Sequence, residues 1–200
     1  DPIFVGAGRL GLPVAIHVAD PKAFWHPPDQ QNERYAELRV HPGWSYHGKD
    51  VPSWQKLQKQ FANLVHRHKN TIFVGVHFGN AAEEPARVAR LLDKCPNLYI
   101  DTAARIPEMG RHPPEKMRRF FEKYQDRIIF GTDLVVGPDT LVLGSSGAKQ
   151  PTSKDIQLFF VSTWRYFETR EKKFLHPTPI QGDWKIDGIG LKPAVLRKIY

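Results

Sequence analysis

Short apolar runs alternate with helix-type hydrophobic patterns along most of this chain. Four of the runs are rich in β-branched and aromatic residues, and each has the length of a single strand. They occupy residues 13–18, 71–77, 97–101 and 127–133. Because these runs are apolar throughout, they predict strands of a parallel sheet that is covered on both faces.

Helical hydrophobic patterns occupy the segments between these strands. The first covers residues 54–69: Ser53 is a residue type that caps helix N-termini, and the basic residues at 66–69 suit the negative end of a helix dipole. Further helical patterns cover residues 85–92 and 114–124. This alternation predicts an α/β fold built from parallel βαβ units with right-handed crossovers.

The remaining segments are less regular. Residues 21–52 are rich in Pro, Gly, His and aromatic side chains, and they are too long for an ordinary connection, so we expect a functional loop there. After residue 133 the pattern loosens, and residues 134–190 are expected to be largely irregular. The elements expected towards the C-terminus are an extended loop, an aromatic helix, an irregular segment and the start of a final helix, at residues 137–151, 156–167, 176–190 and 191–200.

Composition and charge exclude several classes of protein. The 200 residues, 40% of them hydrophobic, suffice for the core of one domain, and no apolar run has the length needed to cross a membrane. The net charge of +8 is spread over the solvent faces of separate predicted helices, so we expect neither a nucleic-acid nor a membrane partner. Cys95 is the only cysteine, which rules out an internal disulfide framework. We therefore expect a cytoplasmic protein in which Cys95 packs as a small apolar residue.

Polar groups able to bind a metal or move a proton stand at the ends of the predicted strands. They are His17, His77 and Asp133, with Asp101 as a fourth. Because the carboxyl ends of parallel strands meet at one side of the sheet, residues far apart in sequence converge there. One buried histidine is more often a satisfied core residue than a ligand, but two histidines and an aspartate at equivalent positions are difficult to explain by packing alone. Neutral imidazole and carboxylate both suit zinc and similar divalent ions.

The segments around these residues resemble strands of the amidohydrolase-related (amidohydrolase 2) family. Those that resemble its strands five, six and eight are Ala15-Ile16-His17-Val18, Val76-His77-Phe78-Gly79-Asn80 and Phe130-Gly131-Thr132-Asp133. The run at 96–101 looks like its strand seven, and the run at 188–193 is similar to its closing segment. The Gly-Thr-Asp match after a strand is fairly specific in this order, whereas each histidine alone is a weak match.

The resemblance implies a partial (β/α)8 barrel in which residues 1–200 form a single partial domain, the C-terminal half, with approximately strands five to eight. It implies a metal-dependent hydrolase in which a divalent metal, expected to be zinc, activates water for attack on a carbonyl-type carbon. His17 would be a metal ligand, and Asp133 a ligand or the base that handles the activated water. His77 would be either a ligand of a second metal or an acid/base group beside a small-molecule substrate.

One part of the family pattern is missing from this sequence. The family takes two further ligands from a His-x-His pair on its first strand, and the only such spacing here, His66-Arg67-His68, lies at a predicted helix end. The chain also begins at Asp1-Pro2, within an apolar pattern and without a signal-peptide pattern, so we interpret it as a segment of a longer protein. We expect weak metal binding and no turnover from these 200 residues, and an unpaired sheet edge that allows a homo-oligomer.

Other residues are weaker candidates. Asp20 could support His17 from behind or belong to an Asp-Pro turn, and Asp101 either orients the site or caps the following turn. Arg105 and Arg111 lie in the loop after the third strand and could hold an acidic group of a substrate. Several histidines and tryptophans of the long loop either line a pocket or pack within the loop: Trp25, His26, His41, Trp44 and His47.

Three other functions remain open at this point. Non-oxidative decarboxylation, which also occurs in the family, would use the same metal frame on an aromatic or enoic acid. A non-catalytic barrel or binding protein would keep the architecture without the reaction. A polyanion-binding module would show a steep salt dependence of its nucleic-acid affinity.

Overall fold

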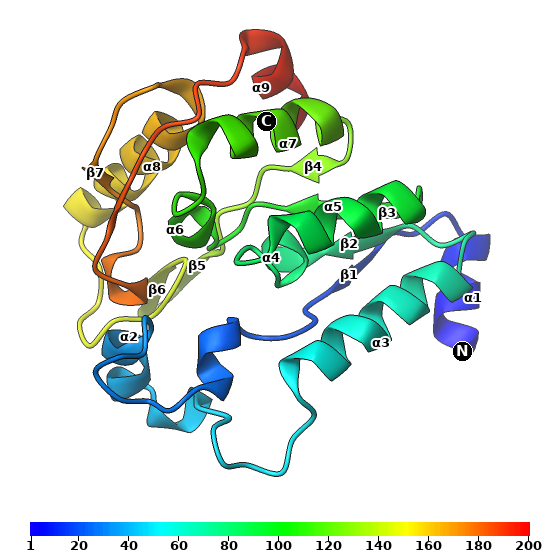
Figure 1. The fold of residues 1–200 in the computed structure, drawn as a ribbon, viewed down its shortest axis with the longest axis horizontal. Helices are drawn as coiled ribbons and strands as arrows, with labels where there is room; N and C mark the ends of the chain where they lie inside the picture. The colour runs from blue at the N-terminus through cyan, green and yellow to red at the C-terminus, as the bar shows by residue number, and fades with distance from the viewer.

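The computed structural model describes residues 1–200 and contains one four-stranded parallel sheet (Figure 1). Its strands are β1 (Val14–Ile16), β2 (Phe73–Gly75), β3 (Leu98–Asp101) and β4 (Ile128–Ile129), in the order β1-β2-β3-β4. All three strand pairs are parallel. The four strands, their order along the chain and their direction therefore confirm the predicted βαβ pattern, although each strand is shorter than its apolar run.

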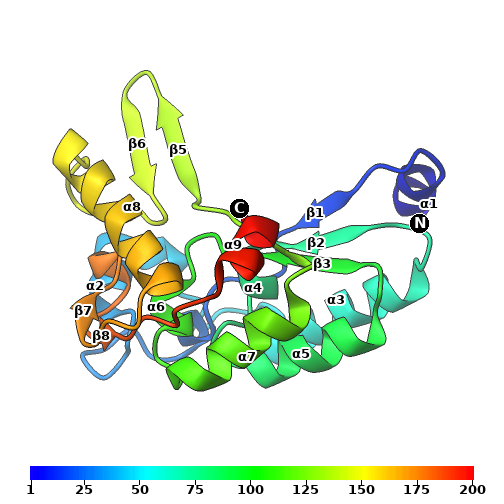
Figure 2. The same ribbon diagram turned by 90° about the horizontal axis from the view of Figure 1, so that it is seen from above.

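Three long helices follow the strands and lie on one side of the sheet (Figure 2). They are α3 (Trp54–Arg67), α5 (Pro85–Lys94) and α7 (Pro114–Tyr124), close to the predicted limits. Helix α3 begins as expected, because Oγ of Ser53 accepts a hydrogen bond from the backbone N–H of Lys56 at 3.2 Å.

The expectation that the sheet is covered on both faces is wrong for these residues. Alternate strand side chains, such as Phe73, Leu98 and Ile100, are fully buried in the main core with the helices. Side chains on the opposite face are more accessible, and Ile129 is 43% exposed. An apolar run indicates that both faces of a strand favour burial, but it does not identify which part of the protein packs against each face.

The chain also begins with a helix that the pattern did not predict. Helix α1 (Pro2–Arg9) is capped by Asp1, whose side chain accepts a hydrogen bond from the N–H of Ile3. None of its residues is fully buried, and it lies at the end of the molecule beside β1 (Figure 1). Two glycines inside the helix, Gly6 and Gly8, lower its intrinsic helix propensity, and for this reason the sequence pattern did not predict it.

The long segment 21–52 is folded into short turns of helix. These are η1 (Lys22–Trp25), α2 (Tyr35–Val40) and η2 (Pro42–Trp44). Shorter helical turns also follow β2 and β3, namely α4 (Val76–Gly79) and α6 (Ile106–Met109). Several residues of 21–52 are buried, so this segment packs as part of the domain.

The C-terminal region is more regular than expected. At the start of the segment 134–190, which was expected to be largely irregular, β5 (Leu134–Gly137) and β6 (Thr140–Leu143) form an antiparallel hairpin that projects from the body (Figure 2). Helix α8 (Ser153–Glu168) follows, with Thr152 and Asp155 as a capping box. Helix α9 (Pro193–Ile199) starts at Pro193 as predicted.

The segment 176–190 is mostly irregular, as expected. It contains η3 (Pro179–Gln181) and β8 (Lys185–Ile186), which pairs antiparallel with β7 (Phe174–Leu175). No helix anywhere in the chain has both the length and the apolar character needed to span a membrane.

Candidate active site

Residues that follow four neighbouring strands line one cavity of about 480 Å³. His17 follows β1 directly, His77 lies just past β2, Arg105 follows β3, and Asp133 follows β4. Asp20 joins them from the loop after β1. The structure therefore brings together the polar groups that the strand ends predicted, because parallel strands direct all their carboxyl ends to one side of the sheet.

The two histidines of the cavity contact each other. Their ring centroids lie 5.0 Å apart in an edge-to-face arrangement. The His17 side chain is 48% exposed, and its Nε2 lies 3.8 Å from Oδ1 of Asp20. The other oxygen of Asp20 accepts a hydrogen bond from the Tyr46 hydroxyl at 2.6 Å. Burial and this bond to Asp20 raise the pKa of Tyr46 to about 12, so its hydroxyl stays a donor that holds Asp20 beside His17.

His77 is held at both its backbone and its ring. Its backbone N–H donates to Oδ1 of Asp101 at 2.7 Å, and its ring Nδ1 donates to the carbonyl oxygen of Ala103 at 2.9 Å. Burial first, and then the charge of Arg105, lower the pKa of His77 to about 4, so the ring is neutral at pH 7. Because Nδ1 carries the proton, Nε2 keeps a free lone pair.

Asp101 supports the turn after β3 as well as His77. The same Oδ1 accepts the backbone N–H of Ala103 at 3.1 Å. Burial raises the pKa of Asp101, and the two backbone hydrogen bonds oppose that rise. The Asp101 carboxylate therefore does both things that the sequence left open: it caps the turn that follows β3, and it fixes the backbone of His77 in the site.

Asp133 stands at the base of the hairpin. Burial raises its pKa, and the charges of Arg105 and His17 oppose the rise. Its backbone has a positive φ of 60°, like His77 at 56° and Ala104 at 55°. Left-handed conformations are unfavourable for residues with a Cβ, and such strained residues cluster at functional sites. Here they occur at the ends of three neighbouring strands, a feature that no sequence pattern revealed.

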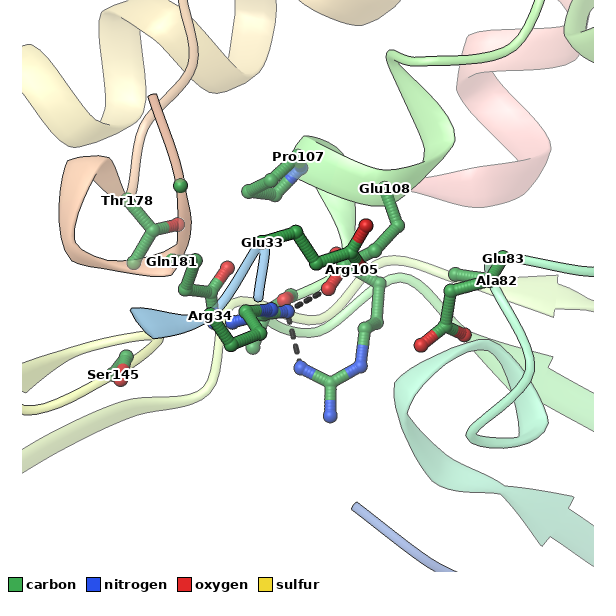
Figure 3. Close-up of polar contacts among 12 residues, drawn as sticks. Glu33, Arg34, Ala82, Glu83, Arg105, Pro107, Glu108, Ser145, Thr178 and Gln181 are labelled. Atoms are coloured by element: carbon green, nitrogen blue, oxygen red, sulfur yellow. Dashed lines mark hydrogen bonds and ion pairs between the residues drawn. The ribbon is translucent and has the colours of Figure 1, made fainter. Parts of the chain in front are cut away.

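A cluster of buried charges lies at the wall of the cavity (Figure 3). Arg34, from the long loop, forms ion pairs with Glu37 of α2 and Glu108 of α6, and all three side chains are buried. Glu37 also accepts a hydrogen bond from the hydroxyl of Ser145, which follows the hairpin. The cluster therefore joins the long loop to α6 and to the segment after the hairpin, which form one wall of the cavity.

Arg111 and most of the candidates from the long loop 21–52 lie away from the cavity. The short helix α6 separates Arg111 from Arg105, and Arg111 pairs with Glu33 over the ring of Trp184. Together with His26 it lines a separate pocket of about 730 Å³. The remaining predicted positions are Trp44, which lines the cavity; His41, which donates to the Ser146 carbonyl; Trp25, which packs on Tyr46; and His47, which is exposed.

The single His-x-His spacing of the chain lies at a helix end, as predicted. His66 and Arg67 form the last turn of α3, and His68 is its C-cap. None of the three lines the 480 Å³ cavity, although Arg67 lines a separate hollow of about 440 Å³ that His17 also borders. By contrast, Tyr46, Arg34 and Glu37 do line the cavity, and the sequence did not single them out. Their only signal was the unusual length of the segment 21–52.

The polar groups of the cavity match a divalent metal in kind but not in number. Neutral imidazole and carboxylate are suitable ligands, and the exposed ring of His17 and the free Nε2 of His77 are available. However, no three His, Cys, Asp or Glu side chains of the chain are grouped closely enough to hold one ion. A catalytic zinc site uses three protein ligands, so these residues fit part of such a site.

Comparison with known protein families gives one match. The family model described as amidohydrolase matches the chain over residues 1–200. No curated protein and no solved structure matched the chain.

Proposed function

Because this chain belongs to the amidohydrolase family, we propose that it carries part of the active site of a metal-dependent hydrolase acting on a small molecule. The observation that carries the proposal is the convergence of His17, His77 and Asp133 from three strands of one sheet into one cavity. A divalent metal, proposed to be zinc, would supply Lewis-acid activation of water there.

We further propose that the sheet is part of a (β/α)8 barrel. Three observations support this: the strands are parallel and ordered along the chain, the long helices cover one face, and the polar groups lie at the carboxyl ends. In such barrels the helices lie outside, the inner face is filled by strand side chains, and the active site is at the carboxyl end. The half-covered sheet found here suits that arrangement better than a doubly covered sheet.

Each polar residue of the cavity has a distinct proposed role. His17 would bind the metal through its imidazole, and Asp20, held by the Tyr46 hydroxyl, lies 3.8 Å from its Nε2 as a neighbouring carboxylate. Asp133 would be a ligand or accept a proton at its carboxylate. His77, held by Asp101, presents the lone pair of Nε2 to the cavity, where it either binds metal or accepts a proton from the substrate.

Non-oxidative decarboxylation is the second candidate reaction. Arg105 favours it, since a buried guanidinium in the same cavity suits a substrate that carries a carboxylate. A panel of lactones, amides and aromatic acids would separate the two reactions, with CO2 release as the readout for decarboxylation. A protein that binds members of the panel without turning over any of them would favour a non-catalytic binding function.

Metal analysis tests the ligand assignment directly. Zinc would be titrated into the wild-type chain and into His17→Ala and Asp133→Asn, with metal content measured after dialysis. We expect weak binding by the wild type and a further loss in both variants, because each variant removes a proposed ligand. His66→Ala is the matched control and should bind like the wild type. Unchanged zinc content in both cavity variants would defeat the assignment, and tight stoichiometric retention by the wild type would show that the site is complete.

A further inference from the structure

Arg105 is a buried cation without a carboxylate partner. Its side chain lines the cavity, and the residue is only 6% exposed. The one hydrogen bond that its guanidinium makes within the protein runs from Nη1 to the carbonyl oxygen of the preceding residue, Ala104, at 2.9 Å. In Figure 3 no dashed line joins it to a carboxylate. Most of its donor groups therefore have no partner within the protein and are available to a group in the cavity.

The neighbouring charges do not satisfy Arg105. The two buried glutamates, Glu37 and Glu108, form their ion pairs with Arg34 instead. Arg34 also repels Arg105, while Glu37, Glu83 and Asp20 attract it from beyond ion-pair distance. Buried charges in proteins are normally paired, because transfer of an unpaired charge out of water is unfavourable. An anionic group of a ligand would supply the missing partner.

We propose that Arg105 binds the carboxylate of an organic acid in this cavity, beside His17, His77 and Asp133. The planar guanidinium fork matches a carboxylate through two parallel hydrogen bonds, a geometry that a lysine lacks. The cavity volume of about 480 Å³ accommodates a small acid. The inference rests on the proposed function for the choice of cavity, and it deepens that function by naming the substrate class.

The local fold explains why Arg105 has this role and Arg111 does not. The left-handed backbone of Ala104 turns the chain directly after β3, so that Arg105 enters the cavity. Arg111 comes after α6, is more exposed, and already has Glu33 as its partner. Two arginines of one loop thus differ in whether a counter-ion is present.

A binding experiment tests the proposal without relying on activity. Benzoate and its neutral counterpart benzamide would be titrated into the chain by calorimetry. The titrations would use protein as purified and protein dialysed against a chelator. Benzoate that binds through a metal ion would then lose its affinity after chelation, whereas benzoate that binds to Arg105 would not. We expect benzoate to bind at least about tenfold more tightly than benzamide in both preparations, as charge-assisted hydrogen bonds imply.

Substitutions at Arg105 and Arg111 test which residue is responsible for the preference for benzoate over benzamide. Arg105→Gln should abolish the preference for benzoate, while the matched control Arg111→Gln should keep it. If Arg105→Gln does not fold, Arg105→Lys replaces it and should weaken benzoate binding several-fold, because the charge remains but the fork is lost. Three results would overturn the proposal: equal affinities of the wild type for benzoate and benzamide, retention of the preference in both Arg105 variants, or displacement of benzoate by inorganic phosphate at tenfold lower concentration.

The outcome is distinguishable from that of the metal experiment. A benzoate preference that survives chelation and depends on Arg105 would stand even if the chain bound no zinc. Conversely, zinc binding that depends on His17 and Asp133 would stand even if benzoate and benzamide bound equally.

Discussion

The backbone N–H of His77 donates a hydrogen bond to Oδ1 of Asp101 at 2.7 Å, and this bond ties the end of β2 to the end of β3. The same oxygen accepts the N–H of Ala103. A single carboxylate oxygen thereby satisfies two backbone donors that the ends of the strands leave unpaired. It also holds His77 in its left-handed conformation, which directs the ring to the cavity.

This relationship predicts different effects for two substitutions of Asp101. Asp101→Ala leaves both N–H groups without an acceptor and should lower the free energy of unfolding by about 2–4 kcal/mol. Asp101→Asn keeps an oxygen at Oδ1 and should retain most of that stability. Denaturant unfolding of both variants would measure the difference. Equal losses in the two variants would show that the negative charge, rather than the acceptor, is what matters.

The left-handed backbone of Ala104 predicts an unusual effect of glycine. Ala104 has a φ of 55°, whereas the neighbouring Ala103 has no positive φ, and both are 7% exposed. Ala104→Gly relieves a strain of about 1–2 kcal/mol, which offsets the added freedom of the unfolded chain, so its stability should equal or exceed that of the wild type. Ala103→Gly relieves no strain and should destabilise by about 0.5–1 kcal/mol. Thermal unfolding in which Ala104→Gly was the less stable of the two would contradict this account.

A buried histidine that does not line the candidate cavity, His176, predicts part of the pH dependence of stability. Burial lowers the pKa of His176 from its ordinary value of 6.5 to about 4, while its Nε2 donates to the Gly182 carbonyl oxygen at 3.0 Å. Between these pH values the unfolded chain binds the proton more strongly than the folded protein. The contribution of neutral His176 to the free energy of unfolding is therefore fully present above the pKa of the unfolded state. It is lost as the pH falls towards the pKa of the folded state, and the loss amounts to about 2 kcal/mol between pH 7 and pH 5.

Two glutamine variants isolate this contribution. His176→Gln can still donate to the Gly182 carbonyl but cannot titrate, so its unfolding free energy should fall less between pH 7 and pH 5 than that of the wild type. His66→Gln replaces an exposed histidine of α3 and should show the wild-type slope. Identical slopes for all three proteins would mean that His176 is protonated in the folded protein at pH 5.

Close backbone packing at Gly188 predicts that this position tolerates no side chain. A Cβ there would lie 2.3 Å from the carbonyl oxygen of Thr169 and 2.9 Å from that of Arg165. Gly188→Ala should therefore destabilise the protein by about 1–3 kcal/mol through overpacking. Gly43, around which a Cβ would meet no atom within 4 Å, is the control, and Gly43→Ala should change the unfolding free energy little. A stable Gly188→Ala would require that the segment after α8 moves freely.

Much of the fold could be predicted from local patterns. The helices α3 and α7 match their predicted limits closely, because amphipathic spacing and end signals such as Ser53 are local properties of the chain. The hairpin of β5 and β6 was missed, because Gly, Pro and Asp at its turn resemble the start of a loop. Helix α1 was missed because of its glycines.

The residues of the candidate site likewise fall into two groups: those that local sequence patterns predict and those whose positions depend on long-range packing. His17, His77 and Asp133 could be predicted to lie together because each follows an apolar strand run, and parallel strands direct their carboxyl ends to one side of the sheet. Tyr46, Arg34 and Glu37 could not be found, because their positions depend on how the segment 21–52 packs over the strand ends. That packing brings together residues far apart in sequence, and hydrophobic periodicity along the chain does not predict such contacts.

The sequence by itself therefore determined the four parallel strands, the three long helices between them and the polar residues at the carboxyl ends of the strands, since each follows from hydrophobic periodicity and chain direction. Only the tertiary structure decided between the two arginines of the loop after β3. Arg105 is buried in the cavity without a carboxylate partner, and Arg111 pairs with Glu33 outside it. The physical reason is that the need for a counter-ion depends on burial and on neighbouring charges, which the folded arrangement alone creates.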